Sequence, residues 1–183
     1  MTAPFFMSAR RRGLAAVAAA ALFWSPLAMA HSPTPASPKI PAPATPLRAA
    51  GTFKVQIQAP QAMSSPEGGP AQARRALEKQ FEGDLQGRSL GDMLAAGQPQ
   101  QGEAAYVALE SFSGTLQGRA GGFALAHLGI MHAGTQDLRI VIVPGSGTGA
   151  LQGISGELRL RIEAGTHHYE LVYTLPASAA TSQ

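Results

Sequence analysis

From residue 52 onward, hydrophobic and polar positions alternate in short runs, and clusters of glycine separate one run from the next. Alternation with a period of two places successive side chains on opposite faces of a β-strand. Short alternating runs between glycine-rich turns are typical of an antiparallel barrel or sandwich. The pattern predicts an all-β domain of eight strands, at residues 52–59, 74–84, 89–95, 104–115, 122–129, 138–143, 149–163 and 167–175.

Residues 71–85 have the composition of a helix, but their pattern is that of a strand. Leu77 and Phe81 share one parity, whereas Glu78 and Glu82 have the other. We therefore predict a strand here, with a helix as the alternative.

A five-residue pattern, Gly-x-Leu-Gln-Gly, occurs three times, at residues 83–87, 114–118 and 149–153. Glycines at fixed spacing beside an apolar residue suit places where barrel strands bend or approach closely. The spacing between copies is too irregular for a solenoid, so the repeat predicts a recurring corner of one closed barrel.

These corners carry a family resemblance. Residues 81–87, 114–123 and 127–129 resemble the bacterial family called domain of unknown function 3224, and so does Val-Pro-Gly-Ser-Gly-Thr-Gly at the start of residues 143–156. The resemblance covers roughly residues 52–175. It implies a small closed antiparallel β-barrel of about eight strands, similar to the allene oxide cyclase, dirigent and other calycin-like barrels. It implies no activity, no cofactor and no catalytic residue.

The N-terminus reads as a secretory signal peptide. A cluster of three arginines precedes an uncharged, alanine-rich run, and Ala28-Met29-Ala30 then offers small residues for cleavage after Ala30. A transmembrane anchor is the alternative, but the run is broken by Pro26 and is shorter than a span requires. We expect export to the periplasm or beyond, by the general secretory or the twin-arginine route.

The remaining boundaries follow from proline. Residues 31–50 contain six prolines, which favours an extended, solvated tether. The barrel domain is assigned to residues 51–176, and residues 177–183 form a disordered tail.

The net charge and the absence of cysteine reduce the number of functions that the sequence supports. The chain has 14 basic and 11 acidic residues, but three arginines lie in the leader, so the exported chain is neutral. A neutral chain without a basic stripe gives no reason to expect nucleic-acid binding or a membrane-surface site. Because the chain has no cysteine, burial rather than disulfide bonds must hold the fold, and no lipid anchor is expected.

The motifs that look chemical do not complete a known site. The run Pro-Gly-Ser-Gly-Thr-Gly is followed by strand alternation rather than a helix, so it predicts a turn between strands and not a phosphate loop. Neither Ser146 nor Ser155 has the flanking glycines of a nucleophile elbow. His167 and His168 point to opposite faces of a strand, so no metal site is expected.

The strongest candidate site pairs Glu110 with His127. Each is an ionisable residue on an apolar strand face. Glu110 shares its face with Tyr106 and Phe112, and His127 shares its face with Phe123. Such groups must be paired, have a shifted pKa or line a polar cavity. A general acid/base pair, a purely structural hydrogen bond and an outward-facing Glu110 in solvent all remain open. Lys79, which shares a face with Leu77 and Phe81, is a further ligand-binding candidate, and a solvated lysine at a sheet edge is the alternative.

These observations favour a barrel that binds a small apolar molecule in its interior. The alternatives are a cofactor-independent isomerase or cyclase that uses Glu110 and His127, and a non-catalytic envelope or assembly module. Val107 and Leu109 lie on the face opposite Glu110 and are also apolar. Apolar residues on both faces predict that part of the exterior is covered, most simply in a homo-oligomer.

Overall fold

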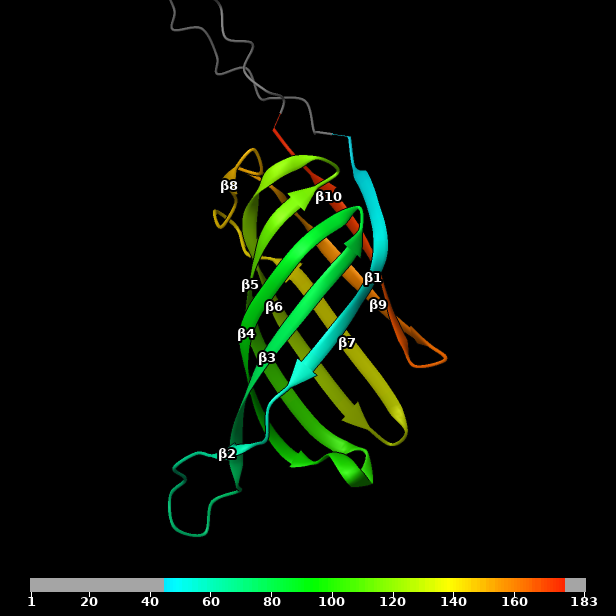
Figure 1. Cartoon of the computed structure of the whole chain (residues 1–183). Helices are drawn as coiled ribbons and strands as arrows, with labels where there is room; N and C mark the ends of the chain where they lie inside the picture. The colour runs from blue at the N-terminus through cyan, green and yellow to red at the C-terminus, as the bar shows by residue number, and fades with distance from the viewer. Residues whose placement is uncertain (1–44, 177–183) are drawn as a thin grey trace, which may run out of the picture. The chain divides into compact units, whose positions relative to one another are not determined.

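The computed structural model describes residues 45–176 (Figure 1). The predicted signal peptide, most of the predicted tether and the predicted tail lie outside the described residues. No helix among residues 45–176 has the length and apolar character needed to cross a membrane.

Ten strands and one short 3₁₀ turn make up the regular structure of the described residues. They are β1 (Leu47–Ile57), β2 (Gln61–Ala62), β3 (Gln72–Gly83), β4 (Leu85–Gln98), η1 (Pro99–Gln101), β5 (Glu103–Leu116), β6 (Arg119–His132), β7 (Thr135–Ile142), β8 (Thr148–Gly149), β9 (Ser155–Glu163) and β10 (Thr166–Thr174).

Eight of these strands form a closed antiparallel barrel. The sheet runs in the order β1-β10-β9-β7-β6-β5-β4-β3-β2, and β1 also pairs with β3, which closes the ring. Because each barrel strand lies beside the next one along the chain, the topology is a simple up-and-down meander. The short strands β2 and β8 are additions that pair with β3 and β6. The predicted all-β barrel of about eight strands is confirmed, and within residues 71–85 the chain forms strand β3 rather than a helix.

Two boundaries differ from the sequence-based expectation. Strand β1 begins at Leu47, so residues 47–50 belong to the barrel rather than to the tether; Ala49 is buried. The single strand expected at 149–163 is split, because β8 ends at Gly149 and β9 begins at Ser155. Gly153 between them has φ +78°, a left-handed conformation that interrupts the extended path of a strand and favours glycine.

The repeated Gly-x-Leu-Gln-Gly corners close the upper end of the barrel, as it is drawn in Figure 1. Leu85, Leu116 and Leu151, the leucines of the three copies, have no exposed surface. Tyr169 crosses the same end and accepts a hydrogen bond from the Leu85 amide at 2.7 Å. Each leucine side chain therefore fills the interior of the barrel at one corner.

The Pro-Gly-Ser-Gly-Thr-Gly run lies beside β6 and accepts hydrogen bonds from its backbone. Strand β7 ends at Ile142, so on the side away from β5 the residues of β6 before Leu125 have only the two-residue strand β8 as a strand partner. Ser146 Oγ accepts a hydrogen bond from the amide of Ala124 at 3.0 Å, and Thr148 Oγ1 accepts one from Gly122 at 2.9 Å. The two hydroxyls thus satisfy backbone donors that the ladder leaves open.

The apolar core fills the upper and middle barrel. Four phenylalanines form a chain of ring contacts across strands β1, β3, β5 and β6, with centroids 5.1 to 5.5 Å apart. They are Phe53, Phe81, Phe112 and Phe123. Such tilted and edge-on pairs are favourable arrangements for aromatic rings. Directly below this aromatic layer lies a single layer of buried polar and charged side chains.

Candidate functional site

Three ionisable side chains meet in the middle of the barrel, one from each of β3, β5 and β6. Lys79 Nζ donates a hydrogen bond to Glu110 Oε2 at 2.6 Å. His127 Nε2 lies 3.1 Å from the same oxygen, although its N–H is not aligned for a hydrogen bond. Ser89 of β4 donates to the other carboxylate oxygen, Oε1. Glu110 is therefore the centre of a four-residue polar cluster of Lys79, Ser89, Glu110 and His127.

The cluster depends on a glycine that lets Glu110 reach across a strand. Gly91 of β4 lies directly opposite Glu110 in the antiparallel register. A Cβ atom at Gly91 would sit 2.4 Å from the carbonyl oxygen of Leu109 and 3.1 Å from the Cβ of Glu110. Without that atom, β4 and β5 approach closely and the carboxylate can extend over β4 to Lys79 on β3.

The aromatic layer covers the cluster from above. Lys79 Nζ lies 4.8 Å from the centroid of the Phe53 ring, close enough for a cation–π contact. Phe112 and Phe123, which the sequence grouped with the candidate ligand-binding residues, are core residues of this layer and are 2% exposed. The ammonium group is thus held between a carboxylate and a ring face.

The surroundings keep Glu110 ionised. Burial raises the pKa of its carboxyl, but the contact with His127, the positive charge of Lys79 and the Ser89 hydroxyl outweigh burial and lower the pKa from 4.5 to about 2. A buried carboxylate with a pKa this low is an ion-pair partner at neutral pH. It is not a group poised to exchange a proton near pH 7.

The cluster is sealed from solvent. The side chain of Glu110 is 0% exposed, that of His127 is 5% exposed and that of Lys79 is 10% exposed. Burial of this kind requires pairing, and the geometry supplies it. The structure therefore brings Glu110, His127 and Lys79 together, as a neutralised layer across the barrel.

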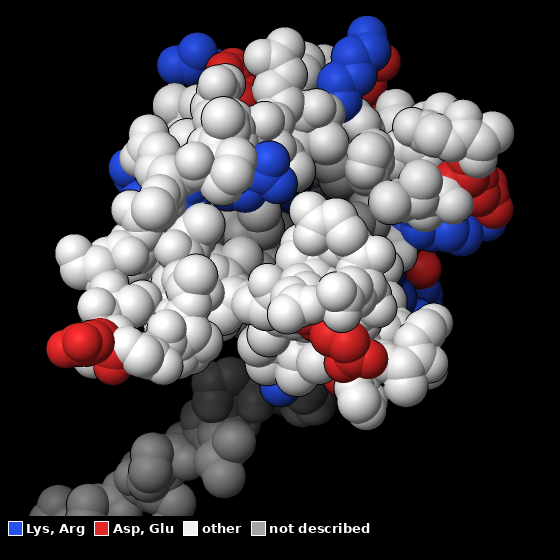
Figure 2. Space-filling view, turned by 90° about the horizontal axis from the view of Figure 1, so that it is seen from below, with Lys and Arg blue, Asp and Glu red and all other residues white. Residues whose placement is uncertain are grey.

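Below this layer, the barrel opens into a cavity of about 640 Å³. Figure 2 views this end from below and shows a central hollow with a mostly uncharged rim. The lining comes from the lower ends of β3 to β6, the residues around β2, and η1. Apolar side chains dominate it, and they include Ala73, Met93, Ala95, Ala104 and Met131. A pocket of this size and character suits a small organic molecule.

Tyr106 is the one sequence-predicted ligand-binding residue that lines the cavity. Its ring packs over Gly129 of β6, where a Cβ atom would lie 2.2 Å from Tyr106 Cε1. Burial, followed by the nearby charge of Glu110, raises the pKa of the Tyr106 phenol. Tyr106 is therefore held in place by a glycine and presents a neutral hydroxyl.

Sequence reasoning missed Ser89, Gly91 and Arg75 as members of the site. Arg75 is half-buried and lines the cavity. Its position two residues before Leu77 on an apolar strand face is the signal that places it inside. Ser89 and Gly91 gave no comparable signal, because their roles depend on what lies on the neighbouring strands.

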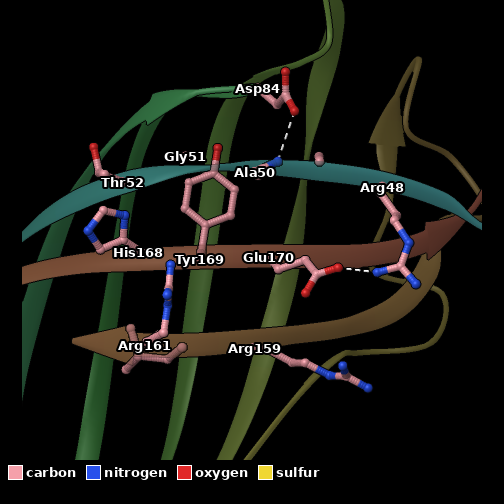
Figure 3. A pocket seen from close by; sticks show the side chains of 12 residues that line it. Arg48, Ala50, Gly51, Thr52, Asp84, Arg159, Arg161, His168, Tyr169 and Glu170 are labelled. Atoms are coloured by element: carbon pink, nitrogen blue, oxygen red, sulfur yellow. Dashed lines mark hydrogen bonds and ion pairs between the residues drawn. The ribbon is translucent and has the colours of Figure 1, made fainter. Parts of the chain in front are cut away.

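A larger hollow, of about 830 Å³, lies across β1, β10 and β9 (Figure 3). Its charged groups are largely paired: Arg48 forms an ion pair with Glu170, and Asp84 Oδ2 accepts a hydrogen bond from the Ala50 amide at 2.8 Å. His168 faces this hollow, whereas His167 packs on the Phe53 ring, 5.1 Å between centroids. The two histidines lie on opposite faces, as predicted. Within residues 45–176, no three His, Asp or Glu side chains form a metal-binding group.

The fold and the site define a small up-and-down β-barrel with a filled upper half, a sealed charge cluster and an open lower cavity. The chain belongs to the DUF3224 family, described as protein of unknown function, whose model matches residues 49–173. The chain is also similar to a solved DUF3224 protein of unknown function from Shewanella oneidensis MR-1. The two are 39% identical with a TM-score of 0.66, over 73% of this chain and 100% of that one. No curated protein matches the chain.

Proposed function

We propose that this protein binds a small, largely apolar molecule in the lower cavity of the barrel. The cavity of about 640 Å³ is the observation that carries the proposal, because it is lined mainly by alanine, methionine, proline and glycine. Clustered apolar surface that no side chain fills gains free energy when a ligand removes it from water. The Tyr106 hydroxyl and a few glutamine side chains supply polar contacts that can orient the ligand.

The polar cluster lies above the cavity, and we assign it a structural role rather than a chemical one. Glu110 lies in a fully buried position and accepts hydrogen bonds from Lys79 and Ser89. Its oxygens are therefore occupied by the protein itself. The geometry favours binding over acid/base catalysis by Glu110 and His127, since a catalytic base must reach the proton that it removes.

A matched pair of cavity variants tests the proposal. Ala95 lines the cavity, whereas Ala120 is exposed on β6 and lies outside it. The purified protein is screened with fatty acids, fatty alcohols and phenols by thermal shift and native mass spectrometry. We expect Ala95→Phe to abolish the ligand-induced shift by filling the cavity, and Ala120→Phe to leave it unchanged. A shift that survives Ala95→Phe, or no shift with any compound, would overturn the proposal.

The proposed site of action is the periplasm or the cell exterior, because residues 1–30 have the pattern of a secretory signal peptide. We expect the exported protein to begin at His31, and deletion of residues 1–30 to retain the chain in the cytoplasm. Fractionation followed by intact-mass measurement checks both statements. A full-length mass in the cytoplasmic fraction would contradict them.

A further inference from the structure

The lower cavity contains one formally charged residue among all the described residues that line it. That residue is Arg75 of β3; the other lining residues are apolar or carry neutral amides and a phenol. A single guanidinium in a largely apolar pocket creates a positive potential that nothing in the lining opposes.

The protein itself does not neutralise Arg75. Its Nε donates a hydrogen bond to the carbonyl oxygen of Gln58 at 3.0 Å, which fixes the guanidinium beside the end of β1. Within residues 45–176, Arg75 has no ion pair and its two Nη atoms have no hydrogen-bond partner. The guanidinium is therefore held in position, and its two Nη atoms are available to donate hydrogen bonds to a ligand.

The two neighbouring cationic residues of β3 are both neutralised. Arg74, on the outer face, forms an ion pair with Asp92 at 2.9 Å. Lys79, the next cation on the inner face, is paired with Glu110 at 2.6 Å. Arg75 is thus the exception on its strand, and it is the one that faces the cavity.

From this arrangement we infer that the ligand is an organic monocarboxylate, with an apolar body and one anionic group that Arg75 binds. This inference rests on the proposed function and specifies the ligand class. The planar guanidinium presents parallel N–H donors that match the two oxygens of a carboxylate. The small apolar side chains of the cavity are suited to the hydrocarbon part of the molecule. Arg75 supplies the counter-charge that makes burial of the anion favourable.

Calorimetric titration with decanoate and decan-1-ol, below their aggregation concentrations at pH 7, tests the inference. The two probes share an apolar chain and differ in charge. We expect wild-type protein to bind decanoate about tenfold or more tightly than decan-1-ol, as for a hydrogen bond to a charged group. Arg75→Gln should remove this preference, while Arg74→Gln, the adjacent outward-facing control, should retain it.

The outcomes separate this inference from the proposed function. If neither probe binds, the inference fails, and the wider thermal-shift screen decides the proposed function separately. If both bind with equal affinity, or if Arg75→Gln retains the preference, the cavity binds ligands but the assignment of Arg75 is overturned. Should Arg75→Gln fail to fold by circular dichroism, Arg75→Lys provides the test. It keeps the charge but loses the paired donors, so we expect a preference reduced severalfold, and an unchanged preference would overturn the assignment.

Discussion

The substitution Glu110→Gln examines the buried charge cluster most directly. It removes the negative charge and leaves the Lys79 ammonium, only 10% exposed, without a counter-charge. Removing one partner of a buried ion pair costs about 3–5 kcal/mol, because the remaining charge is buried and uncompensated. This is a large part of the roughly 5–15 kcal/mol that stabilises a typical domain.

Urea unfolding followed by far-ultraviolet circular dichroism measures the effect. With an m value of about 2 kcal/mol/M, the loss corresponds to a midpoint about 2 M lower. Glu82→Gln is the matched control, since Glu82 pairs with Lys54 at 3.7 Å but is 60% exposed. Exposed pairs contribute about 0–1 kcal/mol, so the control should move the midpoint little.

The double variant Lys79→Met with Glu110→Gln separates burial of a charge from general disruption. Because no ion remains at the centre of the cluster, we expect the double variant to regain much of the stability that Glu110→Gln loses. Equal midpoints for Glu110→Gln and Glu82→Gln, or a double variant less stable than Glu110→Gln, would refute the reasoning.

Three further predictions concern acid stability, the corners and the outer face. Because folding lowers the pKa of Glu110 from 4.5 to about 2, its stabilisation is complete above about pH 4.5 and is lost as the pH falls to about 2; the total is about 3 kcal/mol. Urea titrations between pH 2 and 7 should show this decline in wild type and a smaller one in Glu110→Gln, and identical profiles would contradict it. Leu151→Ala should cost about 2–5 kcal/mol by chemical unfolding, since Leu151 is fully buried, whereas Leu109→Ala, at a 64% exposed position, should cost well under 1 kcal/mol. Leu109 also belongs to an apolar strip on the outside of β4, β5 and β6, together with Leu94, Val107 and Leu128. We therefore expect self-association at micromolar concentration that Leu109→Glu weakens, and a monomeric wild-type mass by light scattering would contradict this.

Much of the barrel was predictable because strand alternation is a local property. Leu77, Phe81 and Phe112 each share a parity with other apolar residues, so the inner faces of β3 and β5 can be recognised before any pairing is known. Glu110 and His127 were detectable for the same reason, since each interrupts an apolar face with an ionisable group. The glycine corners were detectable as a repeat.

Other features depended on how strands far apart in the sequence are aligned. Glu110 meets Lys79 across an intervening strand, 31 residues away in the chain, and the contact requires Gly91 between them. No local pattern records which residues of β3, β4 and β5 lie level with one another. The ion pair between Lys79 and Glu110, and the inclusion of Ser89 in the polar cluster, depend on that register.

The strands, their inward faces and the presence of ionisable groups on those faces could all be inferred from the amino-acid sequence alone. These follow from periodicity and from the cost of burying a charge without a partner. Which of the inward-facing charges is neutralised depends instead on the tertiary arrangement of the strands. Arg74 and Arg75 are the same residue type, but the pairing of β3 with β4 places Asp92 beside the first, and the barrel encloses an apolar cavity beside the second.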